Sequence, residues 1–196
     1  MRLLLDLREV ANHAELRRLA SEADDHGIWG IVVSAAPGAE CLEAAAIAAT
    51  TNNVSILIDI DGDAAHPTTL AEEIAVVDQI SHRRTMALLR GLATHRSKVA
   101  ALLSGLPVDG LILAPPPAQA SIPVYAPEDI PAVSLVDGSK GNAVIVDQHR
   151  DSNTPFLFIS WTGPIKGLAR HLVGRASSTD FPQMIADLAD QIDPIE

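Results

Sequence analysis

The order of apolar runs along the chain predicts an α/β fold built on a parallel sheet. In the first half, short runs rich in Val, Ile and Leu alternate with longer segments whose apolar residues recur every three to four positions. Residues typical of turns, Gly27 and the pair Asn52 and Asn53, separate these segments. Such alternation implies right-handed crossovers between parallel strands, with ligands bound at the carboxyl ends of the strands.

Each expected strand of the first half is followed by a helix. Pro67 fits the first turn of one helix because its missing N–H has no partner to lose there, and Leu70, Ile74 and Val77 fall on one face. The expected strands are residues 2–7, 28–33, 54–60 and 85–89, and the expected helices are residues 14–26, 40–51, the helix opening at Pro67, and about 92–104.

The second half differs, because prolines punctuate residues 115–131 and the gaps between apolar runs are too short for covering helices. We expect residues 1–196 to form a single domain. Eight candidate strands in 196 residues predict a shortened or incomplete (β/α)8 TIM-like barrel, since a complete one takes about 250 residues. Whether the barrel is closed with fewer helices or has lost strands stays open. The candidate strands of this half are residues 108–114, 132–136, 143–146 and 156–160, and residues 180–192 are the candidate closing helix.

Composition excludes several classes of partner. The chain has 25 acidic and 14 basic residues, a net charge of −11 and 3% aromatic residues, which opposes binding to nucleic acid or to an anionic membrane. Cys41 is the only cysteine, so no internal disulfide forms, and no apolar run approaches the roughly 18 to 20 residues of a membrane span. We expect a cytoplasmic protein.

The sequence motifs of several well-known enzyme classes are missing. The seven histidines lack metal-ligand spacing, so we expect no metal site, and no nucleophile elbow, Walker loop or dinucleotide fingerprint occurs. A small aldolase would need a Schiff-base lysine on a strand. Lys98, Lys140 and Lys166 all lie outside the expected strands.

Residues 66–84 read HPTTLAEEIAVVDQISHRR. This segment resembles the luciferase-like flavin monooxygenases, in which a His-Pro opens a helix that runs through Leu-Ala-Glu-Glu and an Asp to a Ser-Gly-Arg before a strand. Residues 19–34 and 45–51 resemble the first two helices of that family and the strand between them. The resemblance covers about the first 90 residues, and it implies that the barrel is luciferase-like.

The chain also departs from the family pattern. His82 replaces the glycine of Ser-Gly-Arg, and the Gly-rich, acid-bearing segment that follows the fourth strand is missing. After Ser34 the family often has a His or an acid facing the flavin, whereas this chain has residues 35–38, Ala-Ala-Pro-Gly. Residues 108–113 resemble a late barrel strand. These departures indicate that catalytic groups have been lost.

The resemblance implies a flavin-dependent oxidoreductase or monooxygenase that uses reduced FMN or a deazaflavin on a small organic substrate. The alternative is a non-catalytic relative that acts as a partner subunit or binds flavin without turnover. His66 is the candidate catalytic residue, although a helix-entry residue packed under the barrel is the other interpretation. The candidate cofactor-binding residues follow expected strands, and they are Ser34, Asp59, Arg90, Gly91, Thr162 and Gly163.

Two further expectations concern assembly and affinity. In the family, the helices beside the second and third strands pack against a second subunit, so we expect a homodimer or a heterodimer with a related subunit. The small residues at 44–49 would let such helices approach closely. Flavin binding should be weak or absent, because a phosphate needs several convergent donors and the chain offers only Arg90, backbone near Gly91 and Gly163, and Arg175.

Overall fold

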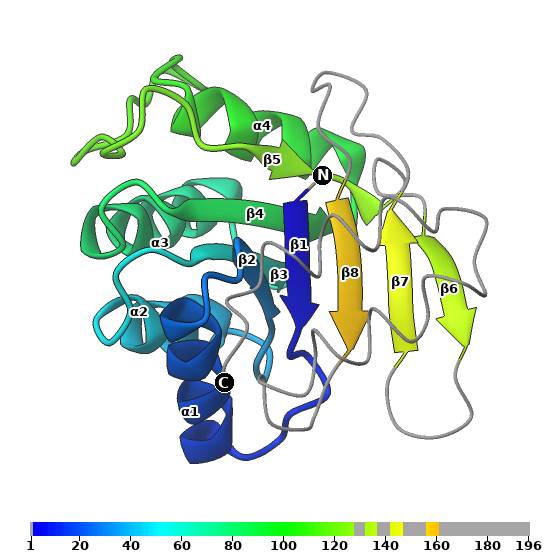
Figure 1. The fold of residues 1–196 in the computed structure, drawn as a ribbon. Helices are drawn as coiled ribbons and strands as arrows, with labels where there is room; N and C mark the ends of the chain where they lie inside the picture. Colours follow the sequence, from blue (N-terminus) through cyan, green and yellow to red (C-terminus); the bar gives the residue numbers. More distant parts are fainter. Residues whose placement is uncertain (1, 128–131, 137–141, 147–155, 161–196) are drawn as a thin grey trace.

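A mixed eight-stranded sheet forms the centre of the protein, with the strand order β5-β4-β3-β2-β1-β8-β7-β6 (Figure 1). The computed structural model describes residues 2–127, 132–136, 142–146 and 156–160. The strands are β1 (Arg2–Asp6), β2 (Gly30–Val33), β3 (Ser55–Asp61), β4 (Thr85–Arg90), β5 (Val124–Tyr125), β6 (Ala132–Val136), β7 (Asn142–Val146) and β8 (Phe156–Ser160).

The strands β1 to β5 are parallel and lie side by side in chain order. The expectation that the first four strands pair in this way is confirmed. On its other side, β1 pairs in parallel with β8, as the first and last strands of a closed barrel do. Beyond β8 the sheet continues through β7 and β6, each of which pairs antiparallel with its neighbour. Among the described strands, β5 and β6 are therefore the two edge strands of the sheet. The fold is therefore a shortened relative of the (β/α)8 barrel.

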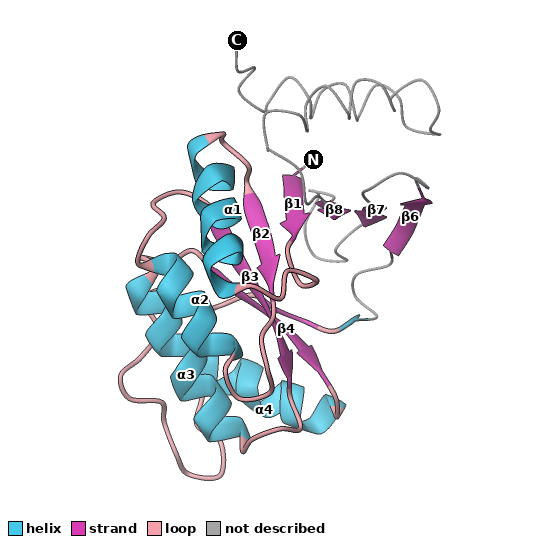
Figure 2. Ribbon diagram, turned by 90° about the horizontal axis from the view of Figure 1, so that it is seen from below, coloured by secondary structure: helices cyan, strands magenta, loops and turns pink. Residues whose placement is uncertain are grey.

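Four helices lie along one face of the parallel strands (Figure 2). They are α1 (His13–Asp25), α2 (Glu40–Ala48), α3 (Pro67–Ile80) and α4 (Ala93–Leu103), and their bounds lie within about three residues of the expected ones. The apolar residues of these helices pack with alternate residues of the strands into the larger core cluster. The opposite face of the sheet carries a second, smaller apolar cluster, formed by Leu4, Val32, Leu57, Met86, Leu88 and Tyr125.

Residues 108–114 do not form a strand, so that prediction is wrong. Asp109 and Gly110 both have positive φ, 51° and 80°, and Val108 and Leu111 exchange two backbone hydrogen bonds of 2.9 Å. An Asp-Gly pair is a common centre of such tight turns, and here it reverses the chain inside the apolar run. The fifth strand is instead β5, so the likeness of residues 108–113 to a barrel strand does not hold.

The other candidate strands of the second half, at residues 132–136, 143–146 and 156–160, are present as β6, β7 and β8. The candidate closing helix at residues 180–192 lies outside the described residues. None of the helices in the described part of the chain has both the length and the apolar character that crossing a bilayer requires.

Candidate functional site

Polar side chains cap the smaller apolar face at the carboxyl ends of the parallel strands. In a strand, residues two apart point to the same face. Asp59 therefore follows Leu57, and Arg90 follows Leu88, on the face opposite the helices. Each strand thus supplies an apolar residue and then, at its end, a charged one. This edge is where barrels of this type bind their ligands.

Asp59 links two arginines at this edge. Its Oδ1 accepts a hydrogen bond of 2.8 Å from Arg90 Nε, and its Oδ2 accepts one of 2.9 Å from Arg8 Nη1. Arg8 also donates to Asp6, from Nε at 2.9 Å and from Nη2 at 2.6 Å. We call these four residues, Asp6, Arg8, Asp59 and Arg90, the ion-pair network.

Burial differs sharply between the acids and the bases of this network. The side chain of Asp59 is 8% exposed and that of Asp6 is 11% exposed, whereas Arg8 is 36% and Arg90 is 50% exposed. Hydrogen bonding to Asp6, together with the nearby carboxylate charges, raises the pKa of Arg8 above its ordinary value despite partial burial. The carboxylates thus form the buried side of the network, and the guanidinium groups form its exposed side.

Two of the expected cofactor-binding residues flank the network. Ser34 Oγ donates a hydrogen bond of 3.3 Å to the backbone oxygen of Asp59. Gly91 has a φ of +94°, and a Cβ built there would lie 2.5 Å from Oδ2 of Asp63. The backbone N–H of Leu92 donates to the same carboxylate, at 3.1 Å and 3.3 Å. The structure therefore brings Ser34, Asp59, Arg90 and Gly91 to one edge, beside a carboxylate from the loop after β3.

His66 is the N-cap of α3, and its Nδ1 accepts a hydrogen bond of 3.3 Å from the backbone N–H of Thr68. Its ring is exposed and opens the helix that follows β3. The helix-entry role is therefore observed, and a catalytic role stays a prediction. Thr162 and Gly163, the other two expected cofactor-binding residues, lie outside the described residues.

Sequence reasoning missed Asp6 and Arg8. The signal was available, because Asp6 follows the apolar run of β1 just as Asp59 follows that of β3. Arg8 lies beyond the strand, and its pairing with a residue 51 positions away has no local signal.

The sequence matches no family model and no curated protein. Solved structures are similar in fold. The monooxygenase RslO1 from Streptomyces bottropensis is 18% identical, with a TM-score of 0.55, and the match covers 64% of this chain and 53% of RslO1. The chain thus spans about half the length of that enzyme. The shared fold is that of a shortened (β/α)8-type barrel.

Two other solved structures are more distant. MsnO8 in its apo form is 15% identical with a TM-score of 0.47, and the match covers 64% of this chain and 48% of MsnO8. The riboflavin lyase RcaE, solved with modified FMN and its substrate riboflavin, is 11% identical with a TM-score of 0.43, covering 98% of this chain and 60% of RcaE.

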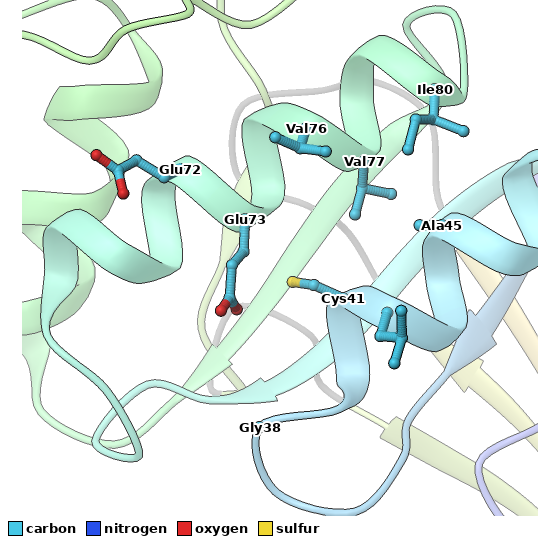
Figure 3. A pocket seen from close by; sticks show the side chains of 9 residues that line it. Gly38, Cys41, Ala45, Glu72, Glu73, Val76, Val77 and Ile80 are labelled. Atoms are coloured by element: carbon cyan, nitrogen blue, oxygen red, sulfur yellow. The ribbon is translucent and has the colours of Figure 1, made fainter.

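A second candidate surface lies on the outside of the barrel, between α2 and α3 (Figure 3). This α2–α3 groove has a volume of about 440 Å³. Figure 3 shows Glu72 and Glu73 toward one end of it and Ile80 at the other. The residues that line it are Gly38, Cys41, Leu42, Ala45, Glu72, Glu73, Val76, Val77 and Ile80.

The groove is lined by apolar side chains that are exposed in a single copy of the chain. Leu42 is 74% exposed, Val76 is 45% exposed and Ile80 is 38% exposed. Within the described residues, no group of three or more His, Cys, Asp or Glu side chains is placed to hold a metal ion. The two candidate surfaces are therefore a charged strand edge inside the barrel and an apolar groove outside it.

Proposed function

We propose that the protein binds a flavin at the carboxyl ends of its parallel strands and acts as a luciferase-like oxidoreductase. The observation that carries this proposal is the ion-pair network above a continuous apolar face. When bound, a reduced flavin would supply hydride transfer or reaction with oxygen. The candidate cofactors are FMN and a deazaflavin, and the substrate would be a small organic molecule.

The apolar face fits a flat ring system. Leu57, Met86 and Leu88 come from neighbouring strands and form one apolar layer without a charged group, and their side chains are buried, at 1%, 6% and 6% exposure. A ring at the rim of this layer, where Asp59 and Arg90 end it, would have one side against apolar side chains and away from water. These residues would therefore hold the ring and exclude water from one of its faces.

The polar edge of the same ring would meet Arg90. Within the described residues, only Nε of its guanidinium group makes a hydrogen bond, so Nη1 and Nη2 remain available as donors. Asp59 fixes the plane of the group through that Nε bond. Arg90 would thus orient a carbonyl-bearing ring edge, with Ser34 beside it.

A second candidate function is flavin binding without turnover. Both carboxylates of the ion-pair network already accept hydrogen bonds from guanidinium groups. Their oxygens are therefore engaged, and neither is free to take a proton from a substrate. Nδ1 of His66 is likewise engaged with Thr68. This arrangement is the observation in favour of the second candidate, a binding protein or a partner subunit.

We also propose that the α2–α3 groove joins two copies of this chain. Two α3 helices crossing antiparallel about a two-fold axis would cover the exposed apolar residues of both grooves. The same packing would bring Glu72 and Glu73 of one copy toward the exposed Arg83 at the end of the other α3. Opposite charges would then meet at both ends of the interface. A heterodimer with a related subunit is the other possible outcome.

A titration tests the flavin proposal. Quenching of FMN, riboflavin and deazaflavin fluorescence by the full chain should give saturable binding of at least one of them. Arg90→Ala should weaken it about tenfold, because one charge-assisted hydrogen bond contributes roughly 1.5–3 kcal/mol. Arg18→Ala, which removes the same charge from the outer face of α1, is the control. Oxygen consumption with chemically reduced flavin separates the enzyme from the binding protein.

No binding of any of the three at millimolar concentration would overturn the proposal. Equal loss of binding in Arg90→Ala and Arg18→Ala would show that the flavin does not bind at the strand edge.

A further inference from the structure

The guanidinium groups at the strand edge are already neutralised by the protein itself. Two positive charges, on Arg8 and Arg90, meet two negative charges, on Asp6 and Asp59, at distances of 2.6 to 2.9 Å. Asp61, the last residue of β3, is the register partner of Arg90 and adds another carboxylate to this edge. Among the described residues, this network therefore offers an incoming anion no uncompensated positive charge.

One backbone N–H at a helix start near this edge is also paired with a carboxylate of the chain. Backbone N–H groups at the start of a helix bind phosphates in many α/β proteins. At the start of α4, the N–H of the N-cap residue Leu92 donates to the carboxylate of Asp63. A carboxylate of the chain thus stands where a phosphate oxygen would bind.

These two arrangements have one consequence for the ligand. A phosphate monoester carries a charge of about −1.5 to −2 at neutral pH. At this edge it would lie beside the carboxylates of Asp59 and Asp63, and their repulsion would offset the attraction of the guanidinium groups. An uncharged side chain on the ring meets no such repulsion, and its hydroxyl oxygens can accept hydrogen bonds from the exposed guanidinium groups.

We infer that this site selects a flavin ring without a terminal phosphate, so that riboflavin-type ligands bind at least as well as FMN. The inference rests on the flavin binding proposed above. It assigns Asp59 and Asp63 as specificity-determining residues that exclude phosphate. Neither residue needs to touch the ring to act in this way.

Paired titrations test the inference. Kd is measured for riboflavin and for FMN, each by fluorescence quenching. The wild-type chain should bind FMN no tighter than riboflavin. Asp63→Asn should tighten FMN binding about tenfold, equivalent to about 1.4 kcal/mol, and leave riboflavin binding within about twofold. Asp59→Asn also alters the support of Arg90, so its expected effect is a rise of about tenfold in the affinity for FMN relative to that for riboflavin. Asp25→Asn, an exposed change of equal charge at the end of α1, should change neither.

The possible outcomes distinguish a failure of this inference from a failure of the proposed flavin binding. FMN binding tenfold tighter than riboflavin in the wild-type chain would overturn the inference and leave flavin binding intact. Unchanged FMN affinity in both variants would do the same. No binding of either ligand would overturn the proposed function and the inference with it. Asp63 is 42% exposed, so Asp63→Asn gives the answer if Asp59→Asn does not fold.

Discussion

The fully buried carboxylate of Asp78 accepts two hydrogen bonds from Gln119, one from its backbone N–H at 2.8 Å and one from its side-chain Nε2 at 2.7 Å. Nε2 also donates to the backbone oxygen of Thr85 at 2.8 Å. One glutamine thereby joins the proline-rich segment before β5 to the end of α3 and the start of β4. Because a buried charge without partners is costly, this contact holds β5 in place at the edge of the sheet.

Gln119→Ala should lower the free energy of unfolding by about 1–3 kcal/mol, because it removes a hydrogen bond to a buried charge. Urea unfolding followed by circular dichroism measures this. The matched control is Gln79→Ala, whose exposed side chain donates to the backbone oxygen of Pro116 and should contribute less than about 1 kcal/mol. Equal losses in the two variants would contradict the role given to Asp78.

His82 occupies the position where the luciferase-like pattern has glycine. Its φ is 54°, a left-handed conformation that glycine adopts without steric cost. His82→Gly should therefore raise the free energy of unfolding, by about 0.5–1 kcal/mol. Thr94→Gly, inside α4, is the control and should lower it by a similar amount. A loss of stability in His82→Gly would mean that the histidine ring makes a contact that outweighs the strain.

The first half of the fold could be predicted because its signals are local. The apolar runs of β1 to β4 and the periodicity of α3 are visible within a few residues, and parallel pairing in chain order follows from the alternation. The prediction of a strand at residues 108–114 was wrong for a related reason. Its apolar run fits a strand, and only the conformation of Asp109 and Gly110 shows that the run is folded back on itself.

The candidate site could be predicted in part. Ser34, Asp59 and Arg90 converge because carboxyl ends of parallel strands share one edge, which is a rule of the fold. Their pairing is set by register and by side chains from distant segments, as in the bond from Arg8 to Asp59. A pattern of residue types therefore indicated Arg90 as a donor for a phosphate, whereas the structure shows its Nε already paired with Asp59.

Because the thiol of Cys41 is buried, we expect the free energy of unfolding to fall at high pH. Burial, and next the charges of Glu73 and Glu40, raise the pKa of its thiol from 9.0 to about 12. Above pH 9 the thiol ionises in the unfolded chain but not in the folded one. Its contribution is therefore complete below pH 9 and is lost as the pH rises toward 12, by up to about 1.4 kcal/mol per unit.

Urea midpoints of the wild-type chain and of Cys41→Ala, measured from pH 8 to 11, test this. The difference in unfolding free energy between the two should shrink steadily above pH 9, since other groups titrate equally in both. Parallel curves would contradict it. In the folded chain the thiol should also react slowly with iodoacetamide at pH 8, because the thiolate is the reacting form.

The last prediction concerns the α2–α3 groove. Leu42 is the most exposed of its apolar residues, at 74%, and it would be buried if two copies pack through α2 and α3. Sedimentation at micromolar concentration should then give about twice the 20.7 kDa of one chain. Leu42→Asp should weaken the dimer about a hundredfold, because it removes roughly 1.5–3 kcal/mol of apolar burial and places a charge in the interface. Leu106→Asp, at a residue 57% exposed and outside the groove, should leave the dimer intact. A wild-type chain that stays monomeric, or equal dissociation in both variants, would remove the groove as the dimer interface.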